Sequence, residues 1–143
     1  MAAYLDASAL VKLVVTEPES AALERYLQGQ SVWVSCALAR TEVPRAVARH
    51  DQSFTARARA LLVDVRLFPI TDQLLDAASE IGPPEVRSLD AIHIAAALQL
   101  ESELEAIITY DIRMIDAARA IGIVVAAPGA PHLLNGGSGA RPS

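Results

Sequence analysis

The sequence predicts an α/β fold in which a five-stranded, mostly parallel sheet is flanked by helices on both faces. Three observations support this: the chain has 143 residues, 52% of them are hydrophobic, and short apolar runs alternate with segments of helical character. Such a length suits one domain, and strands that alternate with helices favour a parallel sheet with both faces covered. We expect a single domain over residues 1–128 and a flexible tail at 129–143, rich in Gly, Pro and Ser.

Five short runs, either apolar or rich in β-branched and aromatic residues, are predicted to be the strands. The first is the opening run AAYLDAS, and the second, SVWVS, contains the single tryptophan. The other three lie at residues 65–70, 105–111 and 123–127.

Helices are predicted between these strands from capping residues and apolar spacing. Asp6 and Ser8 are both candidate N-caps for the first helix, and Pro44 should bend its helix or mark its first turn. The expected ranges are about 8–15, 17–27, 37–50, 53–64, 71–81, 88–100 and 112–121. In the helix that Ser88 is expected to cap, the predicted buried face consists of Leu89, Ile92, Ala96 and Leu100.

The composition excludes several classes of protein. A single cysteine, Cys36, cannot form an intramolecular disulfide or a zinc site that needs two thiolates, and it suits a reducing cytoplasm. Asp6 and Lys12 interrupt the apolar start where a signal peptide would need an unbroken run, and no 18 apolar residues follow one another. We therefore expect a cytoplasmic protein without a membrane span.

The charge is unevenly distributed along the chain. A net charge of −5 argues against strong non-specific binding to polyphosphate, but residues 40–59 contain five arginines and only two acids. This segment is either a solvated helix face or a patch that follows a phosphate backbone.

Four acidic residues are predicted to meet at the sheet edge formed by the carboxyl ends of the strands. Asp6 and Asp111 end the first and fourth strands, while Glu42 and Asp90 lie in early turns of helices that begin at that edge. Four ionised carboxylates would repel one another, so either some are protonated or a divalent cation neutralises them. Oxygen ligands without a Cys or His cluster favour Mg²⁺ or Mn²⁺, which can activate water for attack on phosphorus.

Each acid also has a purely structural interpretation. Asp6 can cap a helix, Asp90 can complement a helix dipole, Glu42 can pair with a nearby arginine, and Asp111 can form a turn. Their joint location at one edge favours a shared site.

Four segments, taken in order, resemble a known family. YLDASALVKL, RTEVPRA, SLDAIHIAAALQL and TYDIRMIDAARAIGI resemble the signatures of a PIN domain over about residues 3–128, and most of all those of the VapC toxins of bacterial toxin–antitoxin pairs. The resemblance implies a magnesium-dependent endoribonuclease that is held inactive by a VapB-type antitoxin and usually forms a homodimer. It places the family's catalytic, metal-binding quartet on Asp6, Glu42, Asp90 and Asp111.

Several roles around this quartet stay open. The family's hydroxyl positions fall on Ser8 and Thr109, which either orient a carboxylate or water or act as local caps. Asp116 is an alternative to Asp111, and His93 is either a hydrogen-bonded packing residue or a general base. Candidates to hold the RNA backbone are Arg40, Arg45, Arg49, Arg87 and Arg113.

The mechanism we expect is in-line hydrolysis of an RNA phosphodiester without a covalent intermediate, with Asp6 and Asp90 as the principal ligands. The alternative is a non-catalytic PIN-like module that binds RNA or a protein. A dinucleotide-binding enzyme is disfavoured because the turn after the first strand is not rich in glycine.

Overall fold

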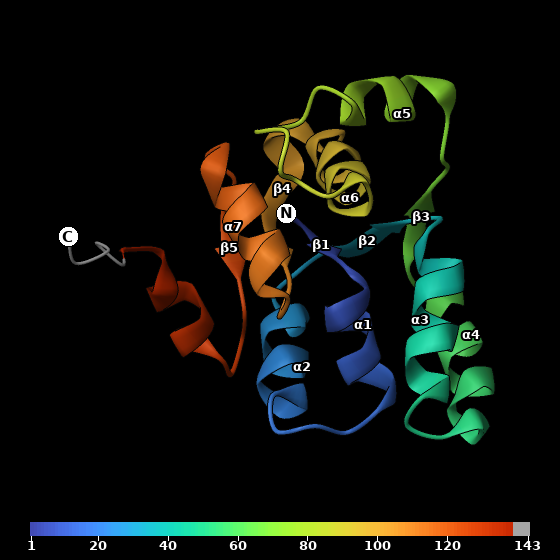
Figure 1. Cartoon of the computed structure of the whole chain (residues 1–143). Coiled ribbons are helices and arrows are strands. Elements are labelled where there is room, and N and C mark those ends of the chain that lie inside the picture. The colour runs from blue at the N-terminus through green and yellow to red at the C-terminus, as the bar shows by residue number, and fades with distance from the viewer. Residues whose placement is uncertain (139–143) are drawn as a thin grey trace.

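The computed structural model of the protein describes residues 1–138 and contains a five-stranded sheet with helices on both faces (Figure 1). Its strands are β1 (Ala2–Leu5), β2 (Val32–Cys36), β3 (Arg66–Phe68), β4 (Leu104–Ile108) and β5 (Val125–Ala126). They follow the order β3-β2-β1-β4-β5, and every neighbouring pair is parallel. The predicted α/β fold with five parallel strands is confirmed.

Two groups of helices cover the two faces of the sheet. The α-helices are α1 (Ala7–Val14), α2 (Ser20–Gln28), α3 (Ala39–Ala48), α4 (Thr55–Val63), α5 (Asp72–Ala78), α6 (Ser88–Leu98) and α7 (Ile112–Ala120). Short 3₁₀ helices lie at Gln52–Phe54, Glu101–Glu103 and Pro131–Ser138. Buried side chains of α1 to α4 form one hydrophobic cluster, and those of α5 to α7 form the other.

The central strand β1 shows why the strand sequences are almost continuously apolar. Successive side chains of a strand point to opposite faces, so Ala3 and Leu5 join the cluster of α1 to α4 while Ala2 and Tyr4 join the cluster of α5 to α7. All four are buried because helices cover both faces.

The strand order creates a crevice beside β1. From β1 the chain builds outward through β2 and β3, and it then returns to the other side of β1 to add β4 and β5. The direction of winding therefore reverses between β1 and β4. In parallel sheets, ligands bind beyond the carboxyl ends of the strands at such a reversal.

Some local predictions about the helices were wrong. Arg87, rather than Ser88, occupies the N-cap of α6. Pro44 lies in the interior of α3, which excludes the first turn, and a bend of the helix at Pro44 stays a prediction. Leu89 is 51% exposed although it was expected in the buried face. The buried part of α6 runs from Ala91 to Ala97 and consists mostly of alanines, whose nearly uniform hydropathy does not define a single face.

Part of the expected flexible tail has regular structure. The Tyr110 hydroxyl donates a hydrogen bond of 2.7 Å to the carbonyl of Pro128, and Pro131–Ser138 forms a 3₁₀ helix. Gly129 has a φ of +83°, and a Cβ there would lie 3.0 Å from the Cβ of Ala22. Residues 139–143 of the tail lie outside the described residues, and flexibility of the tail stays a prediction.

Candidate active site

Asp6 is the most firmly held acid of the predicted quartet. It follows β1 directly and is 5% exposed. Its Oδ1 accepts hydrogen bonds from the Ser8 hydroxyl at 2.6 Å and the Ala9 amide at 3.1 Å, and its Oδ2 accepts one from the Thr109 hydroxyl at 2.6 Å. Asp6 is thus the N-cap of α1, yet Oδ2 keeps a lone pair for another ligand.

Two hydroxyl groups connect Asp6 to the end of β4. The Ser8 hydroxyl accepts a hydrogen bond of 2.9 Å from the Tyr110 amide, and the Thr109 hydroxyl accepts one of 3.1 Å from the Asp111 amide. Both hydroxyls also donate to Asp6, so they orient a carboxylate, one of the two roles that the sequence left open.

Asp90 and Asp111 share the electrostatic surroundings of Asp6. Asp111 is the N-cap of α7, where it accepts a 3.0 Å hydrogen bond from the Arg113 amide, and Asp90 lies in the first turn of α6. Burial, followed by the charges of Asp111 and Asp6, raises the pKa of Asp90. Burial also raises the pKa of Asp6. The charges of Asp6 and Asp111 are therefore close enough to Asp90 to disfavour its ionisation.

Glu42 is held by a buried histidine. Nε2 of His93 lies 2.7 Å from Oε1 of Glu42, while Nδ1 lies 2.8 Å from the Tyr4 hydroxyl and 3.6 Å from Sγ of Cys36. Burial by itself would lower the pKa of His93, but Cys36 and the Glu42 carboxylate raise it to about 10. His93 is 2% exposed, and both of its ring nitrogens are engaged. Its surroundings are those of a hydrogen-bonded packing residue.

The sequence did not indicate the contact between His93 and Glu42. The one available signal was that His93 follows Asp90 by three positions, which places both residues on the same side of α6.

The donors at this edge suit a hydrated magnesium ion better than a closed cage of protein ligands. Among residues 1–138, no group of three His, Cys, Asp or Glu side chains is arranged to hold a metal ion. Mg²⁺ usually keeps several waters and is bound by one or two carboxylates, together with substrate phosphates. The free lone pair of Asp6 and the neighbouring Asp90 carboxylate provide oxygen donors of this kind.

One groove beside the acids is lined by arginines of α3. Glu42, Arg45 and Arg49 share a helix face because they are three and four residues apart. Together with Ser8 and Leu89 they line a cavity of about 460 Å³.

Arg40 does not belong to this groove. It lies two positions before Glu42 on α3, which turns it to another side of the helix. It lines a separate cavity with Arg59 of α4.

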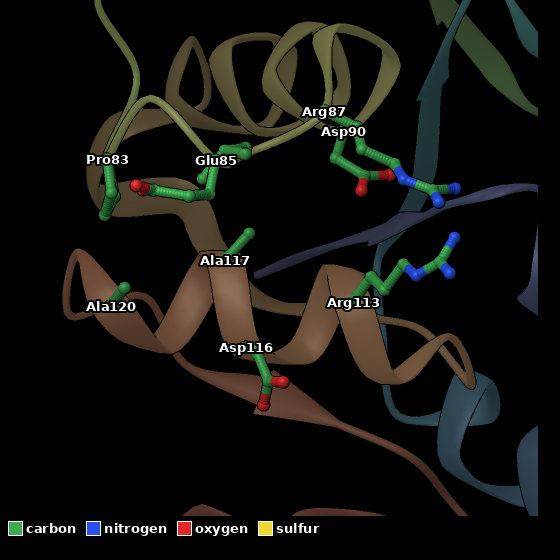
Figure 2. A pocket seen from close by; sticks show the side chains of 9 residues that line it. Pro83, Glu85, Arg87, Asp90, Arg113, Asp116, Ala117 and Ala120 are labelled. Atoms are coloured by element: carbon green, nitrogen blue, oxygen red, sulfur yellow. The ribbon is translucent and has the colours of Figure 1, made fainter.

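A third cavity, of about 360 Å³, lies between α7 and the loop before α6. Figure 2 shows the guanidinium groups of Arg87 and Arg113 on the same side of it as the Asp90 carboxylate. Asp116 also lines this cavity, but its carboxylate points away from Asp90 (Figure 2). Asp111, and not Asp116, is the neighbour that raises the pKa of Asp90.

Known proteins resemble this chain along most of its length. The PIN domain family matches residues 3–120. Ribonuclease VapC46 of Mycobacterium tuberculosis (strain ATCC 25618 / H37Rv) is 47% identical over 127 residues, which cover 89% of this chain and 98% of that protein. Ribonuclease VapC47 of Mycobacterium tuberculosis (strain CDC 1551 / Oshkosh) is 45% identical over 132 residues, which cover 89% of this chain and 97% of that protein.

A solved structure shows the same fold. The crystal structure of Mycobacterium tuberculosis VapC20, a toxin that cleaves the Sarcin-Ricin loop, superposes with a TM-score of 0.69 at 17% sequence identity. The superposition covers 88% of this chain and 99% of VapC20. At this level of identity the similarity concerns the fold alone.

Proposed function

Because this chain belongs to the PIN-domain family and, within it, to the VapC ribonucleases, we propose that it is a metal-dependent endoribonuclease and the toxin of a toxin–antitoxin pair. One observation carries the proposal: Asp6, Asp90 and Asp111 crowd their charges at the crevice beside β1, where burial and repulsion raise the pKa of Asp90. A bound cation would relieve this repulsion.

We assign the metal site to Mg²⁺, with Mn²⁺ as a substitute. Asp6 and Asp90 would be the principal ligands, and Glu42 and Asp111 would complete the site or hold water. When bound, the ion supplies positive charge beside the scissile phosphate and polarises water.

Arginine side chains on both sides of the acids position the RNA for hydrolysis. Arg45 and Arg49 on one side of the acids, and Arg87 and Arg113 on the other, hold the RNA backbone. Water adds to phosphorus and loses a proton, one phosphorus–oxygen ester bond breaks, and the leaving ribose oxygen takes up a proton. The products are a phosphate monoester and a free hydroxyl, so we expect no 2′,3′-cyclic phosphate at the new ends.

Ser8 lies close to this chemistry but is not its nucleophile in our proposal. Its hydroxyl proton is directed to Asp6, and its oxygen accepts the Tyr110 amide. Ser8 therefore serves to hold Asp6 in place.

A protein partner is part of the proposal. Next to Asp90 and Asp111, the side chains of Leu89 and Ile112 are 51% and 56% exposed, and apolar surface of this kind is often covered by a partner. We propose that a VapB-type antitoxin binds here, that the toxin forms a homodimer, and that both act in the cytoplasm. Light scattering of the purified chain with and without antitoxin measures both assemblies.

No helix within residues 1–138 is long and apolar enough to cross a membrane.

The test is cleavage of structured RNA by the purified protein, with Mg²⁺, with Mn²⁺ and with a chelator. We expect cleavage only with a divalent ion, and a loss of more than about 100-fold in Asp6→Asn, since even partners outside the ligand shell contribute about 10–100-fold. Asp111→Asn should also lose activity, because Asn keeps the helix cap but not the charge. Asp76→Asn, on the exposed side of α5, is the matched control and should cleave like the unmodified protein.

Two outcomes would contradict the proposal. Undiminished turnover in Asp6→Asn would refute the site, and RNA binding without cleavage under every metal condition would favour the non-catalytic module.

A further inference from the structure

We propose that the cavity lined by Arg87, Arg113 and Glu85 is the subsite for an RNA nucleotide beside the cleaved phosphate, and that it prefers guanine. The inference rests on the proposed ribonuclease function and adds a base preference to it. The cavity measures about 360 Å³, and binding sites for small molecules span roughly 300–1,000 Å³. It adjoins the acidic site through Asp90, which belongs to both.

One end of the cavity is suited to a phosphate. Arg87 lies at the N-cap of α6 and Arg113 in the first turn of α7, and Figure 2 shows both guanidinium groups beside Asp90. Within the described part of the chain, neither arginine forms an ion pair with a carboxylate. Their donors are thus available to an RNA phosphate, which they would place next to the acids.

The middle of the cavity is suited to a flat ring. Ala117 lies there, while Pro83 and Ala120 lie toward the end that holds the Glu85 carboxylate (Figure 2), and Val86 also lines the cavity. Because the two alanines are small, the α7 side of the cavity leaves room for a planar group to lie against it. Proteins that read single-stranded RNA commonly hold unstacked bases against such surfaces while they bind the base edges.

Glu85 provides acceptors at the other end. Figure 2 shows its carboxylate extending toward Pro83, away from the two guanidinium groups. A hydrogen bond of 3.0 Å from the Val86 amide to the Pro83 carbonyl closes the turn that carries Glu85. Gly82 precedes this turn with a φ of +59°, and a Cβ there would lie 3.2 Å from a methyl group of Val86. The position of Glu85 is therefore restricted by the backbone of its loop.

The chemistry of Glu85 selects the base. An ionised carboxylate only accepts hydrogen bonds, and its two oxygens match two adjacent donors. Guanine presents such a pair, the N1–H and the exocyclic 2-amino group, whereas adenine, cytosine and uracil each present one donor group on that edge. With the phosphate at the arginines and the ring over the alanines, the Watson–Crick edge of guanine faces Glu85.

The first test measures nucleotide binding without metal, so that it does not depend on cleavage. Guanosine 5′-monophosphate (GMP) and inosine 5′-monophosphate (IMP), which lacks the 2-amino group, are titrated into the protein while NMR follows the alanine methyl groups. We expect GMP to bind about tenfold more tightly than IMP, as loss of a hydrogen bond to a charged group predicts. Glu85→Gln should abolish the difference, and Glu80→Gln, an exposed glutamate outside this cavity, should preserve it.

A second variant tests the cavity itself. Ala120→Leu adds bulk at an exposed position of α7, so it should leave the circular dichroism spectrum unchanged while weakening GMP binding at least about fivefold. Equal binding of GMP and IMP by the unmodified protein, or binding that Ala120→Leu does not alter, would overturn the inference.

Cleavage separates this inference from the proposed function. RNA oligonucleotides with guanosine or inosine beside the cut should differ about tenfold in kcat/KM, and Glu85→Gln should remove this difference. Cleavage that ignores the substitution would refute the subsite and leave the ribonuclease intact. A preference for GMP in a protein that cleaves no RNA would instead refute the ribonuclease.

Discussion

His93 and Glu42 are 51 positions apart in the sequence, yet Nε2 of the imidazole lies 2.7 Å from Oε1 of the carboxylate. They belong to α6 and α3, which pack on opposite faces of the sheet. Tyr4 of β1 supports the other ring nitrogen at 2.8 Å. The pair therefore connects both helical layers and the central strand to an acid of the proposed site.

We predict that His93 positions Glu42. In His93→Met the carboxylate loses its hydrogen-bond donor, and kcat should fall about 10–100-fold with little change in KM. His93→Gln can still donate an amide N–H to Glu42 and should recover most of kcat.

Steady-state kinetics on one RNA, with thermal melts as a check of folding, distinguish positioning from packing. If His93→Gln is as impaired as His93→Met although both fold, the positioning role is wrong.

Charge repulsion at the site should make Asp90 destabilising when no metal is present. Burial and the charges of Asp111 and Asp6 disfavour its ionised form, so Asp90→Asn should raise the metal-free Tm by about 3 °C. Mg²⁺ should raise the Tm of the unmodified protein more than that of the variant. Calorimetric scans in chelator and in Mg²⁺ measure both effects, and Asp76→Asn on the exposed side of α5 is the control. A lower metal-free Tm in Asp90→Asn would contradict the electrostatic explanation.

Arg45 and Arg49 should account for part of the salt dependence of RNA binding. Each contact to a phosphate of single-stranded RNA contributes about 0.7 to the slope of log K against log salt concentration. The double variant Arg45→Gln/Arg49→Gln should therefore flatten the slope by about 1.4. Arg40→Gln should leave the slope unchanged, because Arg40 lines a different cavity. Binding titrations over a range of KCl concentrations test this prediction. An unaltered slope in the double variant would show that these arginines contact no phosphate and would favour the interpretation as a solvated helix face.

Lys12 gives the fold a small dependence on pH. Its ammonium group donates a 2.9 Å hydrogen bond to Glu19, and this contact lowers the pKa of Glu19. A lowered carboxyl pKa stabilises the folded state above the ordinary value of 4.5, and the contribution is lost as the pH falls through the lowered pKa.

Lys12→Met should accordingly melt about 1–2 °C lower near neutral pH, and this deficit should shrink in acid. Thermal melts from about pH 7 down to about pH 3 provide the measurement. If the deficit is constant with pH, the effect belongs instead to the contact of Lys12 with Tyr110, in which Nζ lies 4.7 Å from the centre of the ring. The strength of that contact does not change over this pH range.

Much of the fold could be predicted because its signals are local and agree with one another. The apolar runs that become β1 and β4 are bounded by acids, and parallel strands bring those acids to one edge. The location of Asp6 beside Thr109 and Asp111 follows from this topology.

What could not be predicted depends on contacts between distant segments. His93, the partner of Glu42, belongs to the helices on the other face of the sheet. Leu89 is exposed because the alanines that follow it pack into the core in its place. The 3₁₀ helix at Pro131–Ser138 follows a segment that Tyr110 and Ala22 contact from elsewhere in the chain. None of these contacts leaves a periodic pattern in the sequence.

Asp6 has a structural role besides its place in the proposed site, and this role limits which substitutions can inactivate the protein and still leave it folded. Its carboxylate begins α1 as well as facing the crevice, so a substitution that removes only the chemistry must still supply a side-chain acceptor to the Ala9 amide. Asn, Ser and Thr can do so, whereas most other residues would also loosen the first turn of α1. In cells selected for survival of the proposed toxicity, folded but inactive variants at this position should therefore carry Asn, Ser or Thr.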